Sequence, residues 1–401
     1  MRPRQRPCAL PRWGVLCVAA LALLAACAQD DAVAVRRCSG SDCAPVDPAF
    51  CSGSGPVIRA AQDASRCCGA LLAQLLPMAL CSCSDVQGGD LQSDSFDSML
   101  APYASGGTRG DIGVQGLLRA ERSWDIGGAL FSTAAAGVLV QAQAVLRTQG
   151  ALQVQGPLSG AAVITHSDAS VGGAIQLVDL RVDGTLTTPA MSSVVVSGQK
   201  QVAFTAQQDV TVAAPCPCEL DPYVSGPIND LQARNDNASL GLSSQQLELY
   251  RGDVQLDLPC GRYYFSRMAG AGSLRLRILG RVELAVAGGI EIGGGWTVSL
   301  EPSAELDLYV HGDVAVAGPL ALGDPAAPPR LRWFPGGVDA LSFSGGGYLS
   351  AALLGRRRAW MSSTPMDVYG AVVVDSLQIN TSLRVHRDLS LQRLGGGCRT
   401  P

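Results

Sequence analysis

Four acidic residues in the second half of the chain have the chemistry needed for glycoside cleavage. Glu301, Glu305, Asp307 and Asp313 stand at odd positions of a stretch whose even positions are all apolar, glycine or proline. Glycosidases use two carboxyl groups at a set separation around the scissile bond. Stacked strands could align these four acids along an outward-facing groove. Acids on an outward face more often only solvate it, so we favour that interpretation.

Two histidines each precede an aspartate by two residues. His311 comes before Asp313, and His386 comes before Asp388. A His–Asp pair is suited to acid–base work. The chain has no Gly-x-Ser-x-Gly motif that would supply a nucleophile, and its glycine runs lack the Lys-Ser/Thr of a phosphate loop. We therefore expect a protein that is not an enzyme and that carries no cofactor.

Eleven cysteines follow position 27 and are candidates for structural disulfides, because an exported chain sits in an oxidising compartment. Their odd number leaves one thiol unpaired or paired between molecules. The two Cys-x-Cys pairs lack the spacing and the neighbouring histidines of a metal site, so we expect no bound metal. The candidates are Cys38, Cys43, Cys51, Cys67, Cys68, Cys81, Cys83, Cys216, Cys218, Cys260 and Cys398.

The stretch that must position the four acids is Leu274 to Leu322, where apolar and polar residues alternate without a break. An alternation of period two indicates strands with one buried face. Gly288 and Gly312 lie 24 positions apart, as do Gly294 and Gly318, an interval typical of solenoid repeats. The sequence therefore predicts an all-β chain folded as a parallel β-helix or β-solenoid, with even residues inside. Odd residues such as Glu283 are expected to face solvent.

The first residues resemble an export signal. Four arginines precede an apolar run from Trp13 to Leu24, which is too short to span a bilayer comfortably. Leu24-Ala25-Ala26-Cys27 resembles a bacterial lipobox, which implies that Cys27 carries a lipid. Ala28 and Gln29 follow instead of aspartate, which points to the outer membrane, on its periplasmic or cell-surface side. An ordinary signal peptide with an incidental cysteine is the alternative.

Shifts in composition divide the chain into seven segments. Residues 58–80 approach helical spacing, and we expect them to help close an open end of the solenoid. Asn235-Asp236-Asn237 is expected to form an Asx turn or helix cap rather than a calcium loop. The segments are a signal peptide (1–26), a lipidated flexible tether (27–57), a Cys-rich helical cap (58–84), a first solenoid half (108–214), a Cys-containing helical insertion (215–251), a second solenoid half (252–394) and a tail (395–401).

The charge of the chain argues against a nucleic-acid partner. Cleavage before Cys27 would remove four arginines and no acid, which leaves 26 basic against 34 acidic residues and takes the net charge from −4 to −8. Binding to phosphates requires clustered cations. The one cationic run that remains is Arg356-Arg357-Arg358, which we interpret as a solvated loop.

The second half also resembles a bacterial β-helical domain of unknown function, found in pilus-assembly-associated proteins and in exported lipoproteins of the myxobacterial type. The resemblance covers about residues 215–394 and rests on 258–264, 280–284, 304–312, 366–370 and 385–388. It implies right-handed coils and carries no agreed enzymatic activity. The chain departs from the family pattern at Arg387, where a tyrosine is usual.

Together these features predict a non-enzymatic lipoprotein of the outer membrane that acts as a rigid structural or adhesive scaffold. The alternative is a β-helix that binds carbohydrate or cleaves it weakly. Expected partners are the membrane through the lipid, and envelope, matrix-glycan or pilus-like components. Because solenoid ends expose strand edges, end-to-end self-association is also expected.

Overall fold

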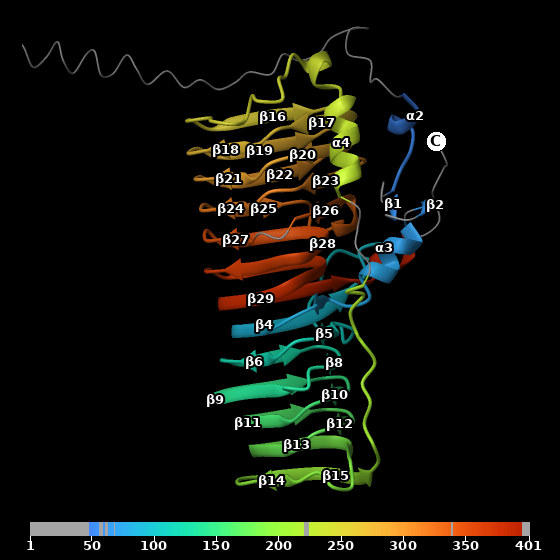
Figure 1. The fold of residues 1–401 in the computed structure, drawn as a ribbon, viewed down its shortest axis with the longest axis vertical. Helices are drawn as coiled ribbons and strands as arrows, with labels where there is room; N and C mark the ends of the chain where they lie inside the picture. The colour runs from blue at the N-terminus through green and yellow to red at the C-terminus, as the bar shows by residue number, and fades with distance from the viewer. Residues whose placement is uncertain are drawn as a thin grey trace, which may run out of the picture.

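A computed structural model describes residues 48–55, 59–60, 63–67, 69–219, 224–337 and 340–394. Within these residues the chain forms one tall stack of short strands (Figure 1). Consecutive coils pair through parallel ladders. The predicted all-β parallel solenoid is therefore confirmed. In the described part of the chain, no helix is long and apolar enough to cross a membrane.

The second half of the chain forms the upper part of the stack in Figure 1. Its strands are β16 (Val254–Leu258), β17 (Gly261–Phe265), β18 (Met268–Gly270), β19 (Leu274–Ile278), β20 (Arg281–Val286), β21 (Ile290–Ile292), β22 (Trp296–Leu300), β23 (Glu305–Val310), β24 (Val314–Val316), β25 (Leu320–Leu322), β26 (Leu331–Pro335), β27 (Leu341–Phe343), β28 (Gly347–Ser362) and β29 (Met366–Asp388).

The first half forms the lower part. Its strands are β3 (Leu80–Ser82), β4 (Val86–Phe96), β5 (Ile112–Val114), β6 (Leu118–Ala120), β7 (Trp124–Ile126), β8 (Leu130–Ser132), β9 (Val138–Thr148), β10 (Leu152–Val154), β11 (Leu158–Thr165), β12 (Ala169–Val171), β13 (Ile175–Thr188), β14 (Val194–Val196) and β15 (Lys200–Gln207).

The two halves are joined by strands that lie at opposite ends of the sequence. The last strand, β29, pairs with β3 and β4, so the end of the chain stacks directly on its beginning. The solenoid starts at β3, earlier than the expected residue 108, and its middle holds both the first and the last strands. Apolar residues from Ala79 to Val385 form one continuous core through both halves.

Alternation places the side chains as predicted in the interior. Ile290 pairs with Val314 and Trp296 with Leu320, which confirms the 24-residue coil at this level. Coil length is not constant: Met268 pairs with Ile290, and Val314 with Leu341. These differences in coil length fall at corners between strands, where added or missing residues leave the ladder intact.

The return toward the upper end begins with residues 208–219, here called the strap. The strap climbs the side of the first half as far as the junction (Figure 1). It hydrogen-bonds to that half at two levels. Gln155 donates to the carbonyl of Val210 and accepts from the amide of Val212, and Gln115 donates to the carbonyl of Cys216. Above the strap lies α4 (Ser225–Ala233), within the predicted helical insertion.

One outer face of the sheet is covered, which the alternation alone does not reveal. Residues of α3 (Gly69–Leu75) and α4 pack with outward-pointing side chains such as Tyr264, Tyr309 and Phe334 in a second apolar cluster. Only the middle of the predicted helical cap is helical, because β1 (Arg59–Ala60) and β2 (Asp63–Cys67) precede α3 as an antiparallel pair and β3 follows it. The cap also does not close an end: α3 packs against η4 (Leu389–Arg393), beside the junction.

The upper end is closed by the chain that follows α4. The side-chain Nδ2 of Asn237 donates to the carbonyl of Tyr264, and its side-chain Oδ1 accepts from the backbone amide of Tyr264, so the side chain bonds as a neighbouring strand would. Asp236 accepts from the amide of Arg262. The Asn235–Asn237 turn therefore caps a sheet edge and precedes η2 (Asn237–Leu240). η3 (Pro328–Arg330) lies in the proline-rich loop.

Candidate functional site

The predicted acids divide between buried ion pairs and the surface. Asp307 is fully buried (0% exposed) and receives two hydrogen bonds from Arg332, at 2.6 and 3.0 Å. The same guanidinium contacts Glu305 at 2.8 Å. These acids meet Arg332 because it is the register partner of Asp307 in the next coil. Burial opposes the charge on Arg332, but Asp307 and Glu305 outweigh it and keep the pKa of Arg332 above its usual range.

The other two acids face solvent and lie elsewhere. Glu301 pairs with Arg277 at 2.5 Å, with both side chains well exposed. Asp313 is exposed and lies 3.9 Å from the buried Arg358, which donates to the carbonyl of His311. The four acids therefore do not line a common groove. Arg358 is also not the solvated cation that the arginine run suggested.

A buried carboxylate beside this network was expected at the surface. Glu283 is 6% exposed and accepts a hydrogen bond from Arg262. Burial and the neighbouring Asp307 raise the pKa of Glu283 to about 7, although Arg262 opposes the shift. The expectation that Glu283 faces solvent is wrong, because this face is covered.

The cover over these charges is the segment that begins with α2 (Pro48–Cys51). The ring of Phe50 lies 4.7 Å from the guanidinium carbon of Arg262 and 4.5 Å from that of Arg281. Arg281 also donates to the carbonyls of Phe50 and Gly55. The charge network is thus a docking site for the chain's own N-terminal segment, which its arginines hold by cation–π contacts and hydrogen bonds.

His386 is at the junction of the two halves. Its Nδ1 lies 2.8 Å from Asp94 of β4, rather than pairing with the nearby Asp388 as the sequence suggested. The hydroxyl of Tyr103 donates to Asp94, and its ring packs on His386 with centroids 4.3 Å apart. Burial, together with the Asp94 carboxylate, raises the pKa of Tyr103. Tyr369 also packs on the histidine ring, with centroids 4.8 Å apart, and contacts Tyr103 edge to face.

The residues after His386 also bind the first half. Arg387 donates to Asp111 at 2.8 Å and to the carbonyl of Pro77. Asp388 accepts from the hydroxyl of Ser98 at 2.6 Å and from its amide at 3.1 Å. Residues 386–388 therefore form a polar seam between the halves, and the departure at Arg387 serves that seam.

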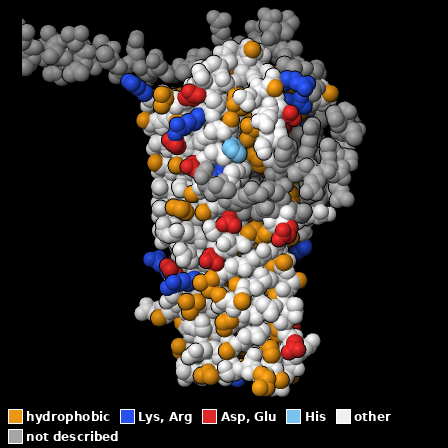
Figure 2. Space-filling model, viewed as in Figure 1, with side chains coloured by type: hydrophobic (Ala, Val, Ile, Leu, Met, Phe, Trp, Pro, Cys, Tyr) orange, Lys and Arg blue, Asp and Glu red, His pale blue; other side chains and the backbone are white. Residues whose placement is uncertain are grey.

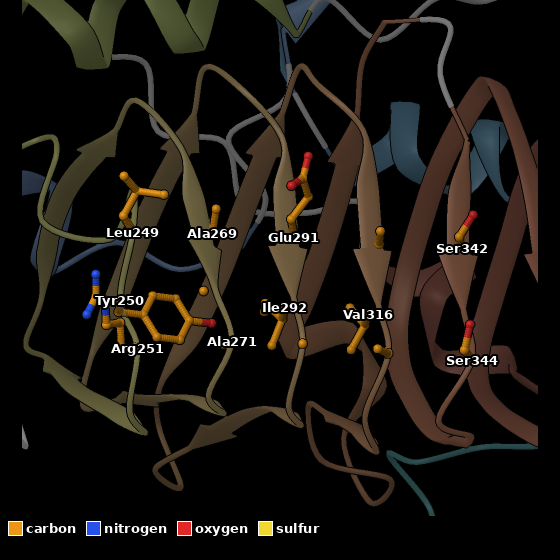
Figure 3. Close-up of a pocket in the computed structure, with 14 residues that line it drawn as sticks. Leu249, Tyr250, Arg251, Ala269, Ala271, Glu291, Ile292, Val316, Ser342 and Ser344 are labelled. Atoms are coloured by element: carbon orange, nitrogen blue, oxygen red, sulfur yellow. The ribbon is translucent and has the colours of Figure 1, made fainter. Parts of the chain in front are cut away.

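A hollow of about 690 Å³ lies on an outer face of the upper half. Its floor follows successive coils, since Ala269 pairs with Glu291, Glu291 with Ala315, and Ala315 with Ser342. Figure 3 shows these side chains along one face, with Leu249 at one end and the serines at the other. The sequence signal was the recurrence of small residues at matched coil positions, which unequal coil lengths obscured.

This groove carries little catalytic chemistry. Its one carboxylate, Glu291, pairs with Arg267 at 2.5 Å. Figure 2 shows charged side chains of both signs scattered over the viewed face rather than gathered in one patch. Across the described ranges, no group of three or more His, Cys, Asp or Glu side chains is arranged to hold a metal ion. The groove is suited to contact with an uncharged, extended partner.

Among the residues that the structure describes, three disulfides join distant parts of the chain. Cys51–Cys260 fixes the N-terminal segment to the upper end, and Cys81–Cys216 and Cys83–Cys218 fix the strap beside the junction. Cys67 ends strand β2. The remaining candidates, including the lipidation site, lie outside the described residues: Cys27, Cys38, Cys43, Cys68 and Cys398.

Comparison with known families supports the expected resemblance over the second half. A family described as a domain of unknown function (DUF7305) matches residues 204–394. The match covers less than half of the chain; it starts within β15 and takes in the strap, α4 and every strand of the upper half. No curated protein and no solved structure matches the chain. The fold and site define a disulfide-linked parallel β-solenoid whose second half is similar to this domain family.

Proposed function

We propose that the protein is a non-enzymatic, lipid-anchored scaffold of the outer membrane that presents rigid faces to envelope, matrix or pilus-like partners. The observation that carries this proposal is the continuous core that runs through both halves. Within the described residues, three disulfides also link segments that are distant in the sequence. Such a body keeps its outer faces at fixed positions. The buried acids are tied to arginines, which favours a structural role for them.

The lipid anchor is proposed from Leu24-Ala25-Ala26-Cys27. Lipid attached to Cys27 would be linked through the N-terminal segment to the upper end, where Cys51 bonds Cys260. The test is labelling with radioactive palmitate followed by fractionation of cells, with Cys27→Ala as the matched variant. The label and the membrane location should both be lost in the variant; a variant still found in the membrane fraction would exclude the anchor.

A second candidate function is carbohydrate binding along the groove lined by Ala269, Glu291, Ala315 and Ser342. The observation behind it is a hollow of about 690 Å³ on an outer face. A glycan array and an assay for new reducing ends would test it with the purified chain. Ala315→Trp, at an exposed floor position, should abolish binding, whereas Arg275→Trp on another exposed strand should not. No binding by the unmodified chain would remove this candidate.

A further inference from the structure

The two ends of the solenoid differ. The upper end is closed by Asp236 and Asn237, which take the place of a neighbouring strand above β17. At the lower end, β14 and β15 each pair with β13 on one side. In the part of the chain that the structure describes, nothing pairs with their other edges. Unprotected edges of this kind invite pairing with another strand.

The lower end is also apolar. Phe204 is 70% exposed, Val195 is 55% exposed and Met191 is 96% exposed. Residues 194–207 include a single charged residue, Lys200. Figure 2 shows hydrophobic side chains at this end as well as along the rest of the viewed face. Proteins usually protect an edge strand with several charges, a proline or a bulge that twists it away, and one lysine is slight protection.

We propose that this end binds the same end of a second copy, so that β15 pairs antiparallel with the β15 of its partner around a two-fold axis. At the upper end Asp236 and Asn237 occupy the edge of β17, which hinders head-to-tail stacking there. Pairing of identical lower ends uses both free edges and stops at two copies, so the product is a closed dimer rather than a fibre. This inference concerns the lower end alone and does not depend on the lipid anchor.

Charge complementarity favours a second copy as the occupant. In an antiparallel pairing centred on Phe204, that residue faces the partner's Phe204, and aromatic cross-strand pairs are stabilising. The same register sets Lys200 opposite the partner's Gln208 and beside the partner's Asp209. The two-fold axis creates this Lys–Asp contact twice, so the charges at the edge attract rather than repel.

Sedimentation velocity across a concentration series tests the proposal on the full chain carrying Cys27→Ala, so that lipid cannot cause association. We expect a monomer–dimer equilibrium with no larger species. Phe204→Glu places like charges across the axis and should weaken dimerisation by roughly tenfold or more. Leu249→Glu, at a residue 87% exposed near the other end, is the matched control and should leave dimerisation unchanged.

Exchange of the charges at positions 200 and 209 tests the register of the proposed pairing between the two β15 strands. Lys200→Glu alone should weaken the dimer, and Lys200→Glu combined with Asp209→Lys should restore it. A chain that stays monomeric at every concentration overturns the proposal, as does open-ended growth or a Phe204→Glu variant that dimerises like the parent. Since the measurement uses neither membrane nor ligand, its failure is distinct from failure of the scaffold proposal.

Discussion

The Nδ1 atom of His386 lies 2.8 Å from Oδ1 of Asp94, although 292 positions separate the two residues in the sequence. This contact joins the last strand of the chain to the first long one. Both side chains are largely buried, and Tyr103 and Tyr369 pack around the histidine ring. The junction of the two halves is therefore a specific interface.

Loss of the contact between His386 and Asp94 should destabilise the whole solenoid. His386→Ala is expected to lower the free energy of unfolding by about 1–3 kcal/mol, because it leaves a largely buried carboxylate with one partner fewer. Urea denaturation would measure the change. His311→Ala, at an exposed histidine, is the control and should have little effect. Equal losses for the two variants would contradict a special role for the junction.

Stability should depend on pH through Glu283, whose pKa burial raises to about 7 from an ordinary 4.5. Between these values the folded chain holds the proton more tightly than the unfolded chain. The stabilising contribution is therefore complete below about pH 4.5 and lost as the pH rises to about 7. Glu283→Gln should melt with the parent at the acidic end and above it beyond pH 7. A difference that does not vary with pH would contradict the assignment.

Arg332 should be essential to the buried network. Arg332→Met leaves Asp307 buried without its main partner and should cost about 3–5 kcal/mol. Adding Asp307→Leu should recover much of that loss, because the only acid then left without Arg332 is the partly exposed Glu305. Arg277→Ala removes an exposed ion pair with Glu301 and should cost about 0–1 kcal/mol. Thermal melts of the four proteins would compare these effects, and a double variant no better than the single one would refute the explanation.

The assignment of inward and outward positions can be tested by charge insertion. Leu284→Asp puts a charge into the fully buried core and should destabilise by several kcal/mol. Val310→Asp should behave in the same way. Arg275→Asp, on an exposed outward position of β19, should change the melting temperature little. Similar melting shifts for inward and outward variants would show that the assignment is wrong.

The disulfides of the strap should contribute strongly because they close long loops. Cys81 and Cys216 are 135 positions apart, and cross-linking a loop of this length is expected to add about 4–5 kcal/mol. Replacing all four of Cys81, Cys83, Cys216 and Cys218 by serine should lower stability toward that of the reduced parent, whereas Cys81→Ser with Cys216→Ser alone should cost less because Cys83–Cys218 still closes the loop. Peptide mapping without reductant should recover Cys51–Cys260, Cys81–Cys216 and Cys83–Cys218. Any other pairing of these six cysteines would contradict the path that the chain takes in this structure.

The interior of the solenoid was predictable because alternation is a local property of the sequence. Leu284 and Val310 could be placed inside from period two alone, and both are fully buried. The exposure of the acids was predicted wrongly because it is not a local property of the sequence. Whether Asp307 or Glu283 meets water depends on α4 and on residues 48–55, which arrive from distant parts of the chain.

The order of the coils also could not be read from local patterns. Nothing near β4 indicates that its neighbour is β29, because the polar seam joins Asp94 and Asp111 to residues 386 and 387 across nearly the whole sequence. The groove floor was missed because Ala269, Ala315 and Ser342 recur at unequal intervals. A strict repeat would have made their alignment visible.

The pairing of β29 with both β28 and β4 has a consequence for how the molecule is assembled. Synthesis proceeds from the N-terminus, so the lower stack is complete before the upper one exists. A chain that stopped before residue 366 would hold two separate stacks, with β28 and β4 facing an empty level. The final strand of 23 residues enters between them. The centre of the finished solenoid is thus the last level to be built, and an intact solenoid requires the chain through Asp388.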